Sequence, residues 1–145
     1  MTRDDVLDQL IRHEGTGPIR NGRLMPYKDS KGILSIGYGR NLQANGVRPS
    51  EARLMLVNDY GEAVTLADGA FPWYSSLDPV RQAVVSELVF NMGLTTVLEF
   101  VNTLEAISRH EFQRAAMGLR RSKWYQDVKE IRGERLATLL ESGQW

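Results

Sequence analysis

The chain contains no cysteine and only two histidines, His13 and His110. The absence of cysteine excludes disulfides, thiol catalysis and zinc sites with cysteine ligands. Two histidines argue against a multi-histidine metal site and against a Ser-His-Asp triad with a second, orienting histidine. No apolar run approaches the roughly 18 residues of a membrane-spanning helix, and none of signal-peptide length follows Met1. We therefore expect no cofactor, no metal, no signal peptide and no stable membrane insertion.

The size and charge of the chain suit an ordinary globular domain. Its 145 residues have a mass of 16.4 kDa, and 42% of them are hydrophobic. Eighteen basic residues balance eighteen acidic ones, which argues against a nucleic-acid-binding protein. Residues 109–135 nevertheless hold eight basic and four acidic residues. This stretch is either a solvated helix surface or a surface that weakly attracts a polyanionic polymer such as a cell wall.

The order of local signals predicts an α+β fold. Thr2 and Asp5 nearly form a capping box for a helix over residues 3–14, which Gly15 closes. Residues 15–42 are rich in glycine and contain two turn sequences, so they predict a small antiparallel sheet. The remaining chain has helical periodicity and helix start signals such as Asp78-Pro79. The helices expected there cover residues 49–67, 79–90, 94–107, 110–120 and 122–141.

We expect one domain over residues 1–145 with two lobes. The β-rich lobe covers residues 13–48. The helical lobe combines residues 1–12 with residues 68–145, and the helix over residues 49–67 joins the two lobes.

Three polar residues near the predicted sheet have the chemistry of a glycosidase site. Glu14 lies in the apolar stripe of the first helix, and a carboxylic acid in apolar surroundings keeps its proton to a higher pH, as a general acid requires. Asp29 opens the second turn, and Ser35 interrupts an apolar strand six residues later. Alone, each has an ordinary structural interpretation: a helix end, a turn cap and a solvent-facing position. Glycoside hydrolases typically use a pair of carboxyl groups on opposite sides of a cleft.

These residues belong to a longer pattern. Glu14-Gly15, followed by Tyr27-Lys28-Asp29 and Ser35-Ile36-Gly37-Tyr38-Gly39, resembles the E-G and Y-x-D-x-x-G-x-x-T-I-G-x-G signature of the phage-type lysozymes, glycoside hydrolase family 24. Later segments resemble the helical lobe of that family in the same order. They are residues 89–93, 100–104, 122–125 and 132–135, and the ending Gly143-Gln144-Trp145.

The resemblance implies a lysozyme-like fold and an endolysin that cleaves the β-1,4 bond between N-acetylmuramic acid and N-acetylglucosamine with inversion. Glu14 would be the general acid, and Asp29 and Ser35 would position and activate the water. Arg132 matches the arginine that pairs with the catalytic glutamate. The resemblance also implies a set of residues that line the substrate cleft: Asn41, Phe90, Asn91, Thr103 and Gly118. Trp124 is more typical of core packing than of a ligand platform.

The resemblance further implies a monomer that acts on peptidoglycan glycan strands. We expect it to wait in the host cytoplasm for release through a holin, or to be carried in a virion.

Three departures from the family pattern are visible. An additional segment, Thr16–Leu24, separates Glu14 from Asp29 and is expected to lengthen a hairpin. Ser35 stands where the family has threonine, and Arg40 stands where a histidine is frequent, with its role open. Gly118 cannot make the side-chain contact of an asparagine.

Two other functions remain compatible with the sequence. A lytic transglycosylase needs only one glutamate and no activated water, so Asp29 and Ser35 would be dispensable. A catalytically silent wall-binding or virion module would tolerate the insertion and Ser35, but it would have no need to keep Glu14, Asp29 and Arg132 together.

Overall fold

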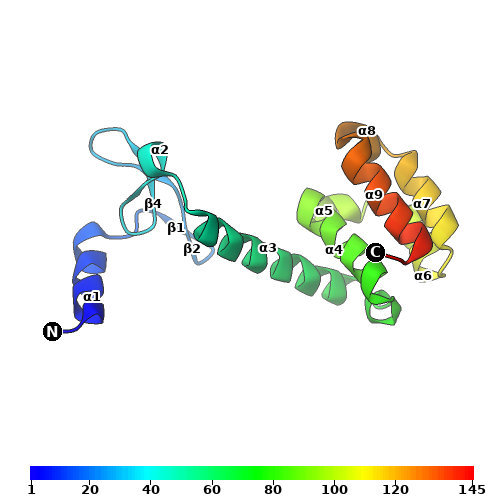
Figure 1. Cartoon of the computed structure of the whole chain (residues 1–145), viewed down its shortest axis with the longest axis horizontal. Helices are drawn as coiled ribbons and strands as arrows, with labels where there is room; N and C mark the ends of the chain where they lie inside the picture. The colour runs from blue at the N-terminus through cyan, green and yellow to red at the C-terminus, as the bar shows by residue number, and fades with distance from the viewer. The chain divides into compact units, whose positions relative to one another are not determined.

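A computed structural model describes the backbone of residues 1–145 and every side chain except those of Lys129 and Glu130. Its contacts divide the chain into two compact units, Met1–Arg53 (unit 1) and Leu54–Trp145 (unit 2). Figure 1 follows the chain from α1 in blue to α9 in red. Helices dominate, with short antiparallel strands near the N-terminus, so the predicted α+β class is confirmed.

Helix α1, Arg3–Glu14, opens unit 1 with the predicted bounds. The Thr2 hydroxyl accepts a hydrogen bond from the Asp5 amide at 3.2 Å, and the Asp5 carboxylate accepts one from the Thr2 amide at 2.6 Å. This complete capping box satisfies two amides that the first helical turn leaves without partners. Gly15 ends the helix at φ 68°, a conformation that favours glycine.

The additional segment Thr16–Leu24 forms a separate hairpin. Strands β1, Ile19–Arg20, and β2, Arg23–Leu24, pair antiparallel around Asn21 and Gly22, which both have positive φ. That geometry matches the turn that Asn-Gly favours. The sequence predicted one sheet over residues 15–42, whereas this hairpin is a sheet of its own. Pro26 follows β2 and has no amide hydrogen to continue a ladder, which explains the interruption.

The second sheet of unit 1 has the strand order β3-β4-β5. Its strands are β3, Tyr27–Lys28, β4, Leu34–Ile36, and β5, Arg40–Asn41. Ser35 is the central residue, opposite Tyr27 on one side and Asn41 on the other. The four-residue helix α2, Leu42–Asn45, follows, and then α3, Pro49–Ala70, begins in unit 1 and continues into unit 2.

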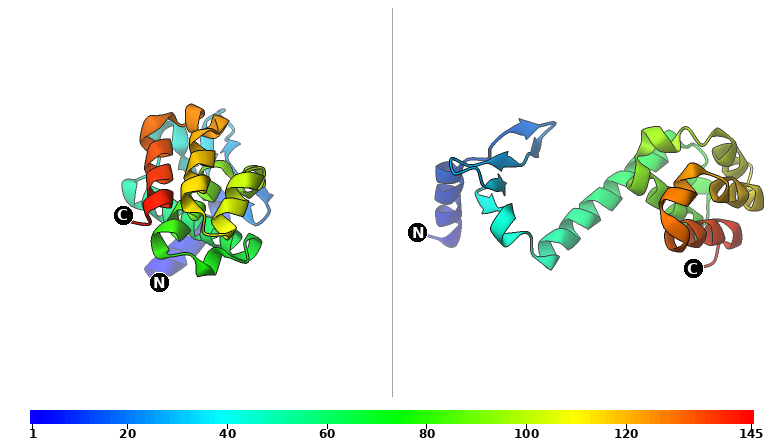
Figure 2. Two further views of the ribbon diagram at one scale, coloured as in Figure 1. Left: turned by 90° about the vertical axis from the view of Figure 1, so that its right-hand side faces the viewer. Right: turned by 90° about the horizontal axis from the view of Figure 1, so that it is seen from above.

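Unit 2 contains the remaining elements. They are the 3-10 turn η1, Tyr74–Ser76, and the helices α4, Pro79–Met92, α5, Leu94–Val97, α6, Val101–Ser108, α7, Phe112–Arg120, α8, Lys123–Asp127, and α9, Lys129–Ser142. Helix α7 contacts both α6 and α9, and Figure 2 shows this group from two further sides.

Two expected helices are each divided in the structure. The helix predicted over residues 94–107 is α5 and α6, separated near Phe100, and the one over residues 122–141 is α8 and α9, separated at Val128. Phe100 packs against the core, and Trp124 of α8 does the same. The first break is three residues long (98–100) and the second is one residue long, and helical periodicity reveals neither of them.

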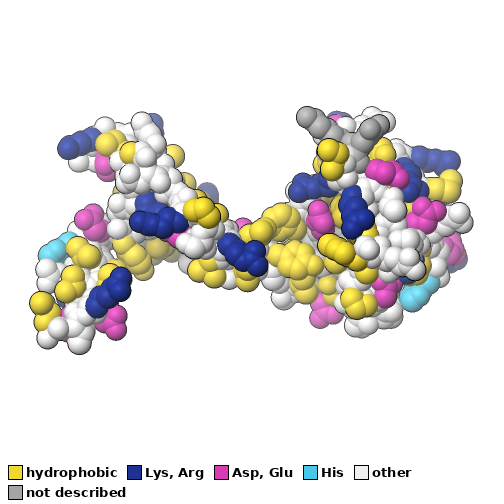
Figure 3. Space-filling view, viewed as in Figure 1, with side chains coloured by type: hydrophobic (Ala, Val, Ile, Leu, Met, Phe, Trp, Pro, Cys, Tyr) yellow, Lys and Arg dark blue, Asp and Glu magenta, His cyan; other side chains and the backbone are white. Residues whose placement is uncertain are grey.

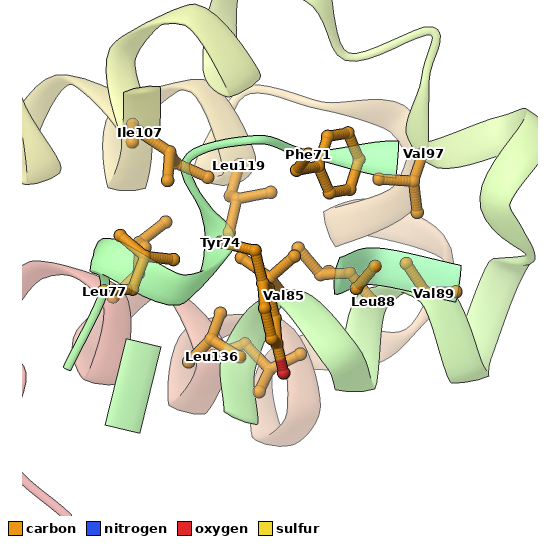
Figure 4. Close-up of a cluster of buried hydrophobic side chains, with 14 of the residues drawn as sticks. Phe71, Tyr74, Leu77, Val85, Leu88, Val89, Val97, Ile107, Leu119 and Leu136 are labelled. Carbon is orange, nitrogen blue, oxygen red and sulfur yellow. The ribbon is translucent and has the colours of Figure 1, made fainter. Parts of the chain in front are cut away.

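The core of unit 2 surrounds α4, in which Val84, Val85 and Ser86 are fully buried. Figure 4 shows a group of these side chains, from η1, α4, α6, α7 and α9 among others. Tyr74 of the core and Ser86 of α4 form a buried hydrogen bond, with their hydroxyl oxygens 2.7 Å apart. The fully buried residues of largest volume are Ile107, Leu119, Leu136 and Leu140, followed by Val84, Val85 and Val97.

The surface of unit 2 carries both kinds of charge, interspersed over the face that Figure 3 shows. Several apolar side chains of α3, including Leu54 and Val57, are exposed. No helix in the described part of the chain has both the length and the apolar composition that crossing a membrane requires. The single domain over residues 1–145 and its division into lobes remain predictions.

Candidate active site

Glu14 lies at the end of α1, and its carboxyl group packs against Gly39 in the turn between β4 and β5. A Cβ atom added to Gly39 would lie 2.9 Å from Glu14 Oε2 and 3.1 Å from its Cδ. Gly39 therefore gives the carboxyl group its space. Within unit 1, Glu14 is exposed, and so are Leu7 and Leu10 of the same helix, so the apolar surroundings expected for this carboxyl are not found in this unit.

Asp29 holds the turn between β3 and β4. Its Oδ1 accepts hydrogen bonds from the amides of Lys31, at 2.8 Å, and Ile33, at 3.0 Å. Its backbone carbonyl also accepts one from Gly32 at 2.9 Å. These bonds fix the side chain by one carboxylate oxygen. Oδ2 has no hydrogen-bond partner among the described residues, so it is available to accept one from a water.

Ser35 lies in the middle of β4 with only 4% of its surface exposed. Its hydroxyl donates a long hydrogen bond of 3.4 Å to the carbonyl of Ile33. The same residue, Ile33, donates its amide to Asp29. Asp29 and Ser35 therefore both hydrogen-bond to the backbone of Ile33, while Glu14 lies beside the turn at the other end of β4.

Arg40, whose role the sequence did not indicate, forms a structural ion pair with Glu51. Its guanidinium forms two parallel hydrogen bonds with Glu51 at the start of α3, at 3.0 and 2.7 Å, and a third with the Gly46 carbonyl at 3.1 Å. The Arg40 hydrogen bonds, assisted by the Arg48 amide, lower the pKa of Glu51 from 4.5 to about 2. Arg40 thereby ties β5 to α3.

Asn41, next in the chain, is the N-cap of α2. Its Oδ1 accepts a hydrogen bond from the Ala44 amide at 2.9 Å. The oxygen of this expected substrate-binding side chain is thus engaged in the fold, which leaves its amide nitrogen as the available donor.

Phe90 and Asn91 lie on α4 in unit 2. Phe90 is 38% exposed, so it is not part of the buried core. The Asn91 Oδ1 accepts a hydrogen bond from the Trp124 indole at 2.8 Å. The Trp124 ring is half-buried against the core, as the sequence predicted.

Thr103 of α6 and Gly118 of α7 lie together in unit 2. Both line a pocket with a volume of about 470 Å³, and Thr103 is 6% exposed. A Cβ atom on Gly118 would collide with the Thr103 hydroxyl. Two of the expected cleft residues therefore line the same pocket.

Arg132 of α9 lies near an acidic partner within unit 2. Its Nε is 3.5 Å from Glu87 Oε1, and both side chains are more than a third exposed. The expected pairing of Arg132 with Glu14 stays a prediction.

Sequence reasoning missed two features of this region. The contact between Gly39 and Glu14 spans 25 residues, and the pairing of Arg40 with Glu51 spans 11, so neither follows from adjacent residues. The repeated glycine in Gly37-Tyr38-Gly39 is the one signal that points to a close approach there. Among the described residues, no group of three or more His, Asp or Glu side chains could hold a metal ion.

Comparison with known proteins identifies the family of this chain. The profile of the phage lysozyme family matches residues 17–141, a range that contains Asp29, Ser35 and the expected cleft residues and begins after Glu14. The probable T4-type lysozyme 2 of Dictyostelium discoideum is 24% identical over 151 residues, covering 83% of this chain and 88% of the relative. The probable T4-type lysozyme 1 of the same organism is 30% identical over 70 residues, covering 48% and 41%. Because the family match covers well over half of its length, the chain belongs to the phage lysozyme family of glycoside hydrolases.

Proposed function

We propose that the protein hydrolyses the β-1,4 bond between N-acetylmuramic acid and N-acetylglucosamine in peptidoglycan, with inversion. Glu14 protonates the leaving oxygen as general acid, and Asp29, with the Ser35 hydroxyl, positions and activates the attacking water. The observation that carries this proposal is the placement of two carboxyl groups at the two ends of β4, with the second one held by a single oxygen.

The length of β4 supports an inverting reaction. A three-residue strand extends about 10 Å at roughly 3.3 Å per residue. Inverting glycosidases keep their carboxyl groups about 6.5–9.5 Å apart to admit a water, whereas retaining enzymes use about 5–5.5 Å. Carboxyl groups at opposite ends of such a strand are further apart than the retaining spacing, which favours a reaction that uses a water.

Binding of the glycan strand is assigned to the expected cleft residues, Asn41, Phe90, Asn91, Thr103 and Gly118, and Arg132 is proposed to support Glu14 as its ion-pair partner. We further propose a monomer that lyses the host cell from within after release through a holin, or from a virion. These roles rest on the resemblance of the motifs and on the family match.

Hydrolysis in water enriched in oxygen-18 tests the reaction. We expect purified peptidoglycan to release muropeptides whose reducing ends carry the heavy oxygen, detected by mass spectrometry. Anhydro ends without label would instead identify a lytic transglycosylase. Absence of any release from folded protein, together with retained wall binding, would identify a silent binding module.

Two variants assign the roles, with Asp8→Asn as a matched control on the exposed surface of α1. Glu14→Gln removes the acid proton and should reduce release about 10²–10⁴-fold without unfolding the protein. Asp29→Asn keeps Oδ1 as a turn acceptor and removes the carboxylate charge that orients the water, so it should also be severe. Full activity in Asp29→Asn would contradict water activation by this residue.

A further inference from the structure

Arg40 follows the turn beside Glu14 and links it to helix α3 through three hydrogen bonds. Its Nη1 and Nη2 donate to the two carboxylate oxygens of Glu51 at 3.0 and 2.7 Å, and Nη1 also donates to the Gly46 carbonyl at 3.1 Å. All of these partners lie in unit 1. Two parallel bonds to a carboxylate fix the orientation of a guanidinium as well as its position. The side chain of Arg40 therefore holds the end of the turn from the side of α3.

Glu51 is itself held in place at the start of α3. Arg48, the residue before the helix, donates its amide to Glu51 Oε1 at 2.9 Å and its guanidinium to the same oxygen at 3.2 Å. A glutamate in the first helical turn that accepts from the preceding amide is half of a capping box. The hydrogen bonds from Arg40, and then from Arg48, lower the pKa of Glu51 from 4.5 to about 2. The pair with Arg40 thus keeps both charges at neutral and mildly acidic pH.

The sheet holds the backbone of Arg40 from the opposite side. Arg40 pairs with Ile36 across the β4–β5 ladder, and the three residues between them form the turn. Two of these residues, Gly37 and Gly39, have φ of 64° and 84°. Glycine adopts positive and negative φ about equally well, so such a turn has little stiffness of its own. Its shape depends on its two ends, and Arg40 is the end that contacts both the sheet and α3.

The turn in its turn places the carboxyl group of Glu14. A Cβ atom added to Gly39 would lie 2.9 Å from Glu14 Oε2, so the carboxyl group packs directly against the residue that precedes Arg40. No hydrogen bond or ion pair to another described residue holds this carboxyl group. Its position within unit 1 therefore depends on the packing against Gly39.

We infer that Arg40 is a positioning residue for the general acid: by fixing the end of the turn between β4 and β5, it fixes where Gly39 holds the carboxyl group of Glu14. The inference rests on the proposed function, because it takes Glu14 to be the acid. It assigns Arg40 no contact with the glycan, since its guanidinium is engaged by Glu51 and Gly46. It gives a role in the reaction to a residue that departs from the family pattern.

The kinetic test compares Arg40→Gln with the natural chain on soluble, uncross-linked peptidoglycan strands. We expect kcat to fall about tenfold with KM nearly unchanged, because the acid moves while the residues that bind the glycan do not. Arg40→Lys keeps the charge without the two parallel bonds and should recover part of kcat. Glu51→Gln should lower kcat to a similar extent. The double variant should lose no more than either single variant, because both changes remove the same interaction.

Arg120→Gln is the matched control in unit 2. Arg120 also forms two parallel bonds, to Glu134 at 3.1 and 2.9 Å, and its side chain is 30% exposed against 29% for Arg40. Arg120→Gln should therefore lower the free energy of unfolding in urea as Arg40→Gln does, but it should leave kcat unchanged. An unchanged kcat in Arg40→Gln, or an equal loss of kcat in Arg120→Gln, would contradict a positioning role.

A second measurement follows the position of Glu14 without any bond cleavage. The NMR signal of the Gly39 amide should shift with pH as the adjacent carboxyl group titrates, and Glu14→Gln defines the part of the shift that this group causes. Arg40→Gln should diminish that part, because the turn no longer keeps Gly39 against the carboxyl group. Arg120→Gln should leave it unchanged. An undiminished shift in Arg40→Gln would overturn the inference.

The two measurements distinguish this inference from the proposed function. If Glu14→Gln releases muropeptides at the natural rate while Arg40→Gln diminishes the Gly39 shift, the proposed function fails and the link from Arg40 to Glu14 stands. If Glu14→Gln abolishes release but Arg40→Gln alters neither kcat nor the Gly39 shift, the proposed function stands and the inference fails.

Discussion

The substitution Gly39→Ala tests whether the position of Glu14 controls activity. The added Cβ would lie 2.9 Å from Glu14 Oε2, whereas ordinary contacts begin at 3.4 Å, so the carboxyl group must shift by at least about 0.5 Å (3.4 − 2.9). Such a shift changes the free energy of unfolding little, because Oε2 ends a flexible side chain. The shift should lower the catalytic rate, since a misplacement of about 1 Å can reduce the rate about 10²-fold. We expect turnover to fall about tenfold.

The control for this substitution is Gly37→Ala in the same turn. Gly37 has φ 64° and Gly39 has φ 84°, so both variants place alanine in a left-handed conformation, at a cost of about 1–2 kcal/mol each. No atom lies within 4 Å of a Cβ added to Gly37, so only Gly39→Ala displaces Glu14. The assay combines muropeptide release at saturating substrate with urea unfolding. Equal turnover in the two variants at equal stability would refute the argument.

Three further predictions concern the hairpin and unit 2. Ser35→Ala should lose much of the muropeptide release, while Ser35→Thr, which retains the hydroxyl, should keep it; equal release by both would make this position structural only. Ser86→Ala leaves the buried Tyr74 hydroxyl without its partner at 2.7 Å and should lower the free energy of unfolding by about 1–3 kcal/mol, which Tyr74→Phe in the same chain should largely restore. Hydrogen bonds from Arg120, and then from Tyr125, lower the pKa of Glu134 from 4.5 to about 2. Because the folded value is the lower one, this contribution to stability is complete above pH 4.5 and disappears as the pH falls towards 2. Urea unfolding across that range should show the loss in the natural chain and a smaller one in Glu134→Gln.

The local elements of this protein follow closely from neighbouring residues. The capping box of Thr2 and Asp5 and the closing Gly15 predicted α1 to the residue, and Asp78-Pro79 predicted the start of α4. Asn21-Gly22 predicted the turn of the β1–β2 hairpin. These signals act within a few residues, because caps and turns satisfy backbone groups of their own segment.

Contacts between distant segments were harder to predict. The breaks at Phe100 and Val128 depend on side chains held by the core of unit 2. The separate β1–β2 sheet depends on Pro26, whose effect on pairing becomes definite only once the neighbouring strands are placed. Neither the helix breaks nor the boundary between the two sheets is visible in the hydrophobic periodicity of the sequence.

The fold class and the residues of the family signature follow from the amino-acid sequence alone, because caps, turns, spacing and motif order are properties of the chain. The contacts of those residues depend on how the chain packs. The tertiary structure placed Gly39 under Glu14, engaged one oxygen of Asp29 in its own turn and committed Arg40 to Glu51. It also brought Thr103 and Gly118 together at one pocket. The contacts of Gly39 and Arg40 join residues 25 and 11 positions apart, so packing rather than local propensity selects them, whereas the hydrogen bonds of Asp29 stay within its own turn.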